Sequence, residues 1–152
     1  MYTEEEVLAM QKQAKELKLK YPECFIVMKP DELIKIANGY GPDRWSKALR
    51  KIVTWIFRHY PAPAAIHDVR YEFSDGKELT RHAADAEFAA NLSLVWQNRY
   101  GFFRYISITA WYDRWKISKA ADLTAKYGRD AWRESFKRHQ KINGALEDKE
   151  DE

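Results

Sequence analysis

A histidine and a carboxylate on successive predicted helices provide the clearest chemistry in the sequence. If the segment around His67 is helical, His67 and Tyr71 share one face of it. Asp85 and Phe88 share a face of the next helix in the same way. The turn signal Asp75-Gly76 lets the two helices pack antiparallel, so that His67, Tyr71 and Asp85 would meet. A histidine whose Nδ1–H is held by a buried carboxylate has its other nitrogen available as a general base.

Asp68 would lie beside this pair but point in another direction, because successive helical residues are about 100° apart. A carboxylate in that place suits a hard cation such as calcium, which prefers oxygen ligands. Carbonyls of the loop 38–43, with Gly39 and Gly41 as the expected ligands, would complete the oxygen shell. Such a metal would polarise an ester carbonyl and stabilise the oxyanion. Without a metal, Asp68 would pair with Arg70, Arg81 or His82.

The string His67-Asp68-Val69-Arg70-Tyr71, followed by Asp85-Ala86-Glu87-Phe88, resembles the H-D-x-x-Y and D-x-x-F patterns of the phospholipase A2 superfamily. The likeness is greatest to its disulfide-poor bacterial, parvoviral and phage branches, in which a Gly-Pro loop such as Gly41-Pro42 precedes the H-D helix. It covers about residues 38 to 92. It implies that His67 is the general base, Asp85 its orienting carboxylate, Tyr71 a hydrogen-bond partner of Asp85, and Asp68 the calcium ligand.

The same resemblance implies a calcium-dependent ester hydrolase that acts on phospholipid at a membrane surface, of the kind that phages and prophages encode. The chain departs from the family pattern in one respect. Gly41 lies farther before His67 than the compact calcium loop of the family does, with a whole amphipathic helix predicted between them. The catalytic pair therefore matches the family better than the calcium site.

Three other interpretations of these residues are open. The scaffold would also suit a non-catalytic structural or interaction module, such as a phage accessory protein, with His67 a core histidine bonded to Asp85. His59, His67-Asp68 and Asp85 follow the H…HD…D order of helical metal-dependent phosphohydrolases, at shorter spacings than that family has. A metal cluster would combine His67-Asp68 and Asp85 with His82.

An aromatic-rich stretch interleaved with basic residues lies in the C-terminal half of the chain. Such a stretch can lie at a membrane interface or stack on nucleic acid. More often its rings are core and its basic side chains extend past them to solvent, and we expect that here. The aromatic residues are Trp96, Tyr100, Phe102, Phe103, Tyr105, Trp111, Tyr112 and Trp115, and the basic ones are Arg99, Arg104, Arg114 and Lys116.

The composition is that of one soluble domain, with 45% hydrophobic and 32% charged residues. The net charge of +3 is too small to indicate nucleic-acid binding. A single cysteine, Cys24, excludes an intrachain disulfide and favours a reducing compartment. The acidic start Met1-Tyr2-Thr3-Glu4-Glu5-Glu6 does not resemble a signal peptide, and no apolar stretch is long enough to span a bilayer. We therefore expect a cytoplasmic protein.

We expect an all-α fold, a single compact multi-helix domain in which two antiparallel core helices carry the H-D-x-x-Y and D-x-x-F patterns. An N-terminal helix spans about 3–20, the core about 38–98 and C-terminal helices about 102–140, before a frayed tail at 143–152. Thr3 and Glu6 form a capping box at the first helix start.

Local signals predict where the other elements begin and end. The apolar run Cys24-Phe25-Ile26-Val27-Met28 indicates a buried strand or an extended connection. Pro30 begins a short helix. Gly101 and Gly128 each indicate the end of a helix, and Asn143-Gly144 the start of the frayed tail.

Overall fold

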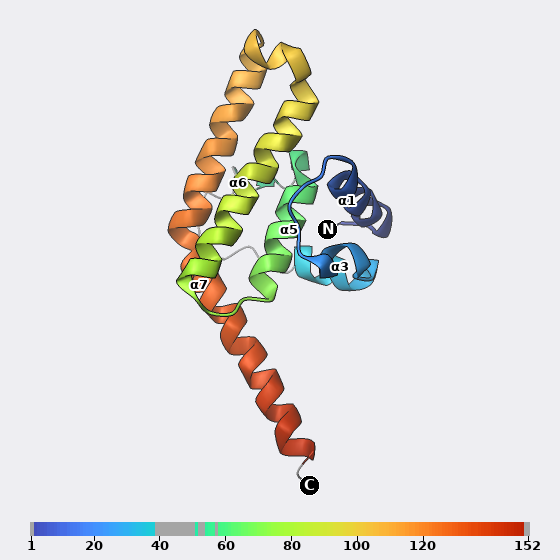
Figure 1. Ribbon diagram of the computed structural model, residues 1–152, viewed down its shortest axis with the longest axis vertical. Coiled ribbons are helices and arrows are strands. Elements are labelled where there is room, and N and C mark those ends of the chain that lie inside the picture. The colour runs from blue at the N-terminus through green and yellow to red at the C-terminus, as the bar shows by residue number, and fades with distance from the viewer. Residues whose placement is uncertain (1, 39–50, 52–53, 57, 151–152) are drawn as a thin grey trace.

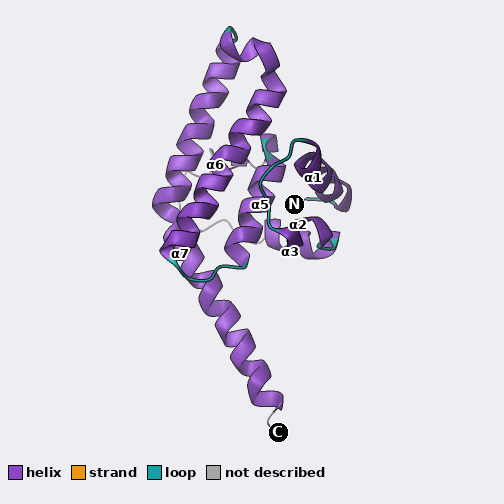
Figure 2. Ribbon diagram, in the orientation of Figure 1, coloured by secondary structure: helices purple, strands orange, loops and turns teal. Residues whose placement is uncertain are grey.

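Helices account for nearly all of the chain that the structure describes. The computed structural model describes residues 2–38, 51, 54–56 and 58–150, and for 139 and 141–150 it describes the backbone alone. No strand occurs in these ranges, which confirms the predicted all-α class (Figure 2). The predicted loop with Gly39 and Gly41 lies outside them. In chain order the elements are α1 (Glu4–Glu16), α2 (Glu23–Val27), α3 (Pro30–Asn38), α5 (Pro61–Glu72), α6 (Glu78–Tyr100), the 3-10 helix η1 (Gly101–Tyr105) and α7 (Ile108–Glu150).

The chain reverses direction between α5 and α6 and again between α6 and α7 (Figure 1). Helix α5 contacts both α6 and α7, and α1 and α3 contact each other and pack on α5. Helices α6 and α7 form a long hairpin joined by η1. The tip of this hairpin projects beyond the N-terminal helices, and the C-terminal end of α7 extends in the opposite direction (Figure 1).

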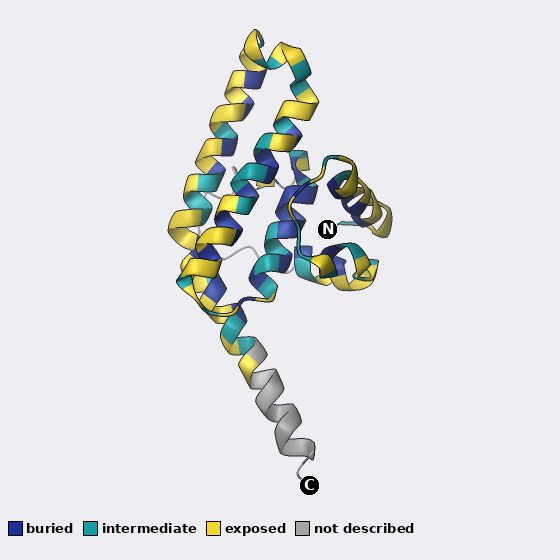
Figure 3. Ribbon diagram, viewed as in Figure 1, coloured by how far each residue is buried: buried dark blue, intermediate teal, exposed yellow. Residues whose placement is uncertain are grey.

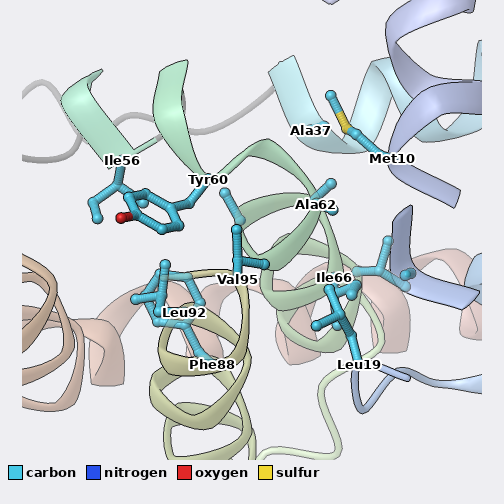
Figure 4. Packing of buried hydrophobic residues seen from close by; sticks show 14 of the residues in the cluster. Met10, Leu19, Ala37, Ile56, Tyr60, Ala62, Ile66, Phe88, Leu92 and Val95 are labelled. Carbon is cyan, nitrogen blue, oxygen red and sulfur yellow. The ribbon is translucent and has the colours of Figure 1, made fainter. Parts of the chain in front are cut away.

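One hydrophobic core joins the N-terminal helices to the hairpin, which confirms a single domain. The buried faces of α1, α5, α6 and α7 are turned toward one another (Figure 3). Helix α5 contributes several alanines to this core, and small side chains let neighbouring helices approach closely. Figure 4 shows the packing of Met10, Leu19, Ala37, Ile56, Tyr60, Ala62, Ile66, Phe88, Leu92 and Val95.

The N-terminal helix begins as predicted and ends earlier. The capping box is present: the Glu6 N–H donates to Thr3 Oγ1 at 3.3 Å, and the Thr3 N–H donates to the Glu6 carboxylate at 2.8 Å. The helix ends at Glu16 instead of about residue 20, because Lys18 adopts a positive φ of 50°. The run from Cys24 to Met28 is not a strand. It forms the short helix α2, which follows the extended Pro22.

Buried amide side chains hold these N-terminal segments in place. The Gln11 side chain on α1 donates to the backbone carbonyls of Phe25 and Met28, at 2.8 and 3.1 Å. Asn91 on α6 is fully buried and bonds Lys20 twice. Its Oδ1 accepts from the Lys20 N–H at 2.8 Å, and its Nδ2 donates to the Lys20 carbonyl at 2.7 Å.

The predicted turn between α5 and α6 is present, and local hydrogen bonds fix it. The Asp75 carboxylate accepts from the Lys77 N–H at 3.0 Å and from the Thr80 hydroxyl at 2.7 Å, and these bonds lower the pKa of Asp75. Gly76 has a φ of +74°, and the Phe136 ring occupies the space of an absent Cβ. A glycine is therefore required at this turn on two counts.

The two other helix-ending glycines behave differently. Gly101 caps α6 with a φ of +49°, which confirms the predicted break. The prediction for Gly128 is wrong, because α7 passes through it and continues to Glu150. This helix also runs through Asn143-Gly144, where we predicted a frayed tail. Gly128 is buried, and a Cβ there would overlap the Tyr71 hydroxyl. A glycine at this position therefore allows Tyr71 to pack closely against the backbone of α7.

The aromatic stretch is not the core segment that we expected. Trp96 and Tyr100 are partly buried, but the other rings are exposed on η1 and on the first turns of α7. Among the described elements, α6 is the one that α7 contacts most, and the outer rings of η1 and of the first turns of α7 remain exposed. Within the described ranges, none of the helices combines the length and the apolar character needed to cross a membrane.

Candidate functional site

Asp85 is the centre of a polar cluster between α5, α6 and α7. Its carboxylate is buried on α6 and faces the H-D-x-x-Y segment of α5. The Tyr71 hydroxyl donates to Oδ1 at 2.7 Å, and His67 Nε2 lies 3.2 Å from the same oxygen. The predicted meeting of His67, Tyr71 and Asp85 is thus confirmed, and the shared turn at Asp75-Gly76 is what aligns their two helices.

His67 faces Asp85 with the nitrogen opposite to the one that we expected. Nε2, and not Nδ1, is the atom near the carboxylate. The imidazole lies between two rings, with its centroid 4.2 Å from Tyr71 and 4.6 Å from Phe88. Its side chain is 11% exposed, and Nδ1 has no hydrogen-bond partner in the part of the chain that is described. If Nε2 carries the proton, Nδ1 is the basic nitrogen.

Arg81 is a member of the cluster that the sequence interpretation missed. One of its guanidinium nitrogens donates to Asp85 Oδ2 at 2.8 Å and to the Ala125 carbonyl of α7 at 3.0 Å. Its Nε donates to Glu78 at 2.9 Å. Burial alone would lower the pKa of Arg81, which is 2% exposed, but the bond to Glu78 and the charge of Asp85 raise it. The spacing of four between Arg81 and Asp85 was the available signal.

Tyr71 is positioned by helix α7. The Trp132 ring meets it edge-on at 5.0 Å, and the Tyr71 hydroxyl lies directly over the backbone of Gly128. Burial, followed by the negative charge of Asp85, raises the pKa of Tyr71 far above its usual range. Tyr71 therefore stays a neutral hydrogen-bond donor to Asp85 at any physiological pH. Each oxygen of the carboxylate is thus held in a fixed direction.

Asp68 is half-buried and has neither a hydrogen bond nor an ion pair with any described residue. Arg70, one of its expected partners, instead bonds Glu87 on α6 through two nitrogens, at 2.9 and 3.0 Å. Burial raises the pKa of Asp68 well above its usual range. The carboxylate lies near Tyr2, whose pKa is raised first by burial and then by the charge of Asp68. Asp68 is therefore a desolvated carboxylate that no described residue neutralises.

Such a carboxylate fits one ligand position of a cation, since a bound cation would neutralise it. Its predicted co-ligands, Gly39 and Gly41, lie outside the described residues. Within the described residues, no three acidic, histidine or cysteine side chains gather at one point where a metal could bind. His82 is exposed on α6 beside Arg81, and His59 Nδ1 lies 2.9 Å from the Trp55 carbonyl. Neither histidine joins His67, Asp68 and Asp85 in the metal arrangements considered above.

The cluster as a whole is a histidine held against the Asp85 carboxylate, with a second carboxylate, Asp68, beside it on α5 that pairs with no described residue. All three side chains come from the two sequence patterns, whereas Arg81 and Gly128, which contact Asp85 and Tyr71, lie outside them. Comparison of the chain with protein-family models, with curated proteins and with solved structures gave no significant match.

Proposed function

We propose that this chain is an ester hydrolase of the phospholipase A2 kind, in which His67 is the general base. The observation that carries the proposal is that one oxygen of Asp85, Oδ1, accepts a hydrogen bond from the Tyr71 hydroxyl and also lies within hydrogen-bond distance of His67 Nε2. This arrangement selects the His67 tautomer whose Nδ1 lone pair is available. The motif resemblance adds the class of substrate, a phospholipid ester.

The residues would divide the reaction in the following way. Nδ1 of His67 takes a proton from a water molecule, and the oxygen of that water attacks the ester carbonyl carbon. The imidazolium so formed is stabilised by the carboxylate of Asp85, and its Nδ1–H returns the proton to the leaving alcohol as the C–O bond breaks. Arg81 donates to the other carboxylate oxygen of Asp85 and fixes the orientation of that group. No net proton is gained by the protein.

Calcium would be held in part by Asp68, and when bound it would supply polarisation of the ester carbonyl. This carboxylate is desolvated and pairs with no described residue, which supports its assignment as a calcium ligand. Calorimetric titration with calcium tests it directly. We expect Asp68→Asn to abolish binding and Asp130→Asn, a change of an exposed aspartate on α7, to leave it unchanged. Equal affinities of the wild type and Asp68→Asn would remove Asp68 from the site.

Hydrolysis of phosphatidylcholine vesicles, with and without calcium, tests the general base. His67→Gln should lower turnover by about 10²–10⁴-fold, the usual contribution of such a base. Asp85→Asn should cost less, because the histidine remains. His82→Gln is the matched control, since it changes an exposed histidine of α6, and it should retain full activity. Undiminished turnover in His67→Gln would show that the histidine is structural.

A second candidate function is that of a non-catalytic interaction module on the same scaffold. Two observations favour it. The His67 ring lies between the rings of Tyr71 and Phe88, and Arg81 forms an ion pair with Asp85. In that case the wild type would hydrolyse no ester, with or without calcium. His67→Gln would then lower only the melting temperature.

A further inference from the structure

The tip of the α6–α7 hairpin has an unusual surface. Rings and aliphatic side chains that normally lie in a core are exposed there on η1, on the connection after it and on the first turns of α7. Ile108 is the most exposed of them, at 88%. We call this surface the aromatic tip. Its members are Phe102, Phe103, Tyr105, Ile106, Ile108, Trp111, Tyr112 and Trp115.

The aromatic tip lies at a protruding end of the protein. It lies at the end of the hairpin farthest from α1 and α3, and exposed surface surrounds it (Figures 1 and 3). Among the described elements, helix η1 packs mainly on α6 and α7. Each apolar side chain that is exposed to water costs free energy. A group of this size at one protruding point therefore indicates a partner that removes these side chains from water.

The charges of the aromatic tip are one-sided. Three arginines lie in or next to its segment of the chain, and among the described residues their hydrogen bonds go to neutral oxygens. Arg99 donates to the His59 carbonyl, Arg104 to Gly101 and Tyr105, and Arg114 to Ser93. The one acidic residue of the segment 96–116, Asp113, is buried and is held by Tyr100 at 2.6 Å and by Lys116 at 3.6 Å. The surface that remains is positive.

We propose that the aromatic tip inserts into the surface of an anionic phospholipid bilayer. Tryptophan and tyrosine are amphipathic and partition to the boundary between headgroups and acyl chains, while phenylalanine and isoleucine enter the acyl region. The three arginines would then reach the lipid phosphates. A protruding apolar point with basic residues beside it has the shape and the charge that a deformable, negatively charged surface accepts.

Two other partners fit less well. In a second copy docked tip to tip, Arg99, Arg104 and Arg114 would approach their own equivalents, with no exposed carboxylate at the aromatic tip to separate them. A single-stranded nucleic acid would use the rings, but the side chains of Ile106 and Ile108 offer no stacking surface. The proposal does not depend on ester hydrolysis, because the aromatic tip shares no residue with the Asp85 cluster.

Co-sedimentation with vesicles tests the proposal. We expect the wild type to bind vesicles of phosphatidylcholine with about 30% phosphatidylserine, more strongly than vesicles of phosphatidylcholine alone, and less at high salt. Phe103→Ser with Ile106→Ser should weaken binding by about tenfold or more, the scale expected for two buried apolar side chains. Leu79→Ser is the matched control. It removes a side chain that is 82% exposed at the other end of α6 and should not change binding.

His67→Gln should bind vesicles like the wild type, which separates this proposal from that of the ester hydrolase. Three results would overturn membrane binding. The first is that the wild type does not bind anionic vesicles. The second is that Phe103→Ser with Ile106→Ser binds them as strongly as the wild type does. The third is that the wild type binds vesicles with and without phosphatidylserine equally well. A single-stranded oligonucleotide that binds through the tip in place of vesicles would identify nucleic acid as the partner. Dimerisation that the double variant abolishes would identify a second copy.

Discussion

The Asp85 cluster and the aromatic tip both lie along the α6–α7 hairpin and use similar kinds of residue, with opposite results. Arginine and aromatic side chains of α6 and α7 occur in both. In the cluster, α5 lies against the hairpin, so Arg81 and Tyr71 are buried and each is bonded to Asp85. At the aromatic tip the described residues provide no such cover for the outer rings, and these stay exposed. Whether such a surface is buried depends on whether another helix packs against the hairpin there, more than on the types of residue that form it.

The largest effect on stability should come from removing one charge of the buried cluster. Arg81→Met leaves the Asp85 carboxylate without its cation and the Ala125 carbonyl without a donor. Loss of one partner from a buried pair typically costs about 3–5 kcal/mol. Urea unfolding measures this loss. Arg133→Met is the control, because that arginine pairs with Glu78 at the surface, where a pair contributes about 1 kcal/mol at most. Equal losses in the two variants would contradict the buried pair.

A smaller loss should follow from filling the space beside Tyr71. Gly128→Ala places a Cβ where the Tyr71 hydroxyl lies. Overpacking costs about 1–3 kcal/mol, and the better helix propensity of alanine returns up to about 1 kcal/mol. We therefore expect a net loss of about 1–2 kcal/mol in the free energy of unfolding. Adding Tyr71→Phe removes the overlapping oxygen. The double variant should lose less than the sum of the single losses, and strict additivity would count against this contact.

Asp68→Asn should stabilise the protein in the absence of metal, and only above acidic pH. Because burial raises the pKa of Asp68, the folded state holds this proton more tightly than the unfolded state does. The resulting stability is fully present below the ordinary pKa of aspartate, near 4, and is lost as the pH rises toward the folded-state value. At pH 7 the variant should gain about 1 kcal/mol, the lower end of the cost of a buried group without a partner. Thermal unfolding at pH 3.5 and 7 measures the difference, and a gain that is equal at both values would contradict it.

The smallest effect on stability should come from the aromatic tip. Phe103→Ser removes a ring that packs on little, so its free energy of unfolding should stay within about 0.5 kcal/mol of the wild type. The same denaturation experiment compares it with Phe88→Ser, a change of the ring that covers His67 in the core. That variant should lose several-fold more. A large loss for Phe103→Ser would mean that the tip is a structural element, and the comparison of the two regions would fail.

The parts of the fold that the sequence predicted correctly depend on local patterns. The spacing of Val7, Met10 and Ala14 predicts the buried stripe of α1, and Asp75-Gly76 predicts the reversal that brings His67 to Asp85. These features depend on helix periodicity and on turn residues. Both can be recognised within a short segment of the sequence.

The parts that were missed depend on contacts between distant segments. Gly128 resembles a helix end until the Tyr71 hydroxyl is placed over it, and the run from Cys24 to Met28 forms a helix in a place that Gln11 holds through two carbonyls. Arg81 resembles a surface residue until Ala125 of α7 approaches it. The exposure of the tip rings follows from the lack of cover by other described residues, and no property of the rings themselves reveals it.

The bond pair between Asn91 and Lys20 has a consequence for local opening of the protein. A primary amide presents one donor and one acceptor, as a peptide group does, so Asn91 holds Lys20 as a neighbouring strand would. The Lys20 amide hydrogen, although it lies outside any helix, should exchange with solvent at the slow rate of the centre of α6. Protection at that single position would then report the free energy at which the N-terminal helices detach from the hairpin.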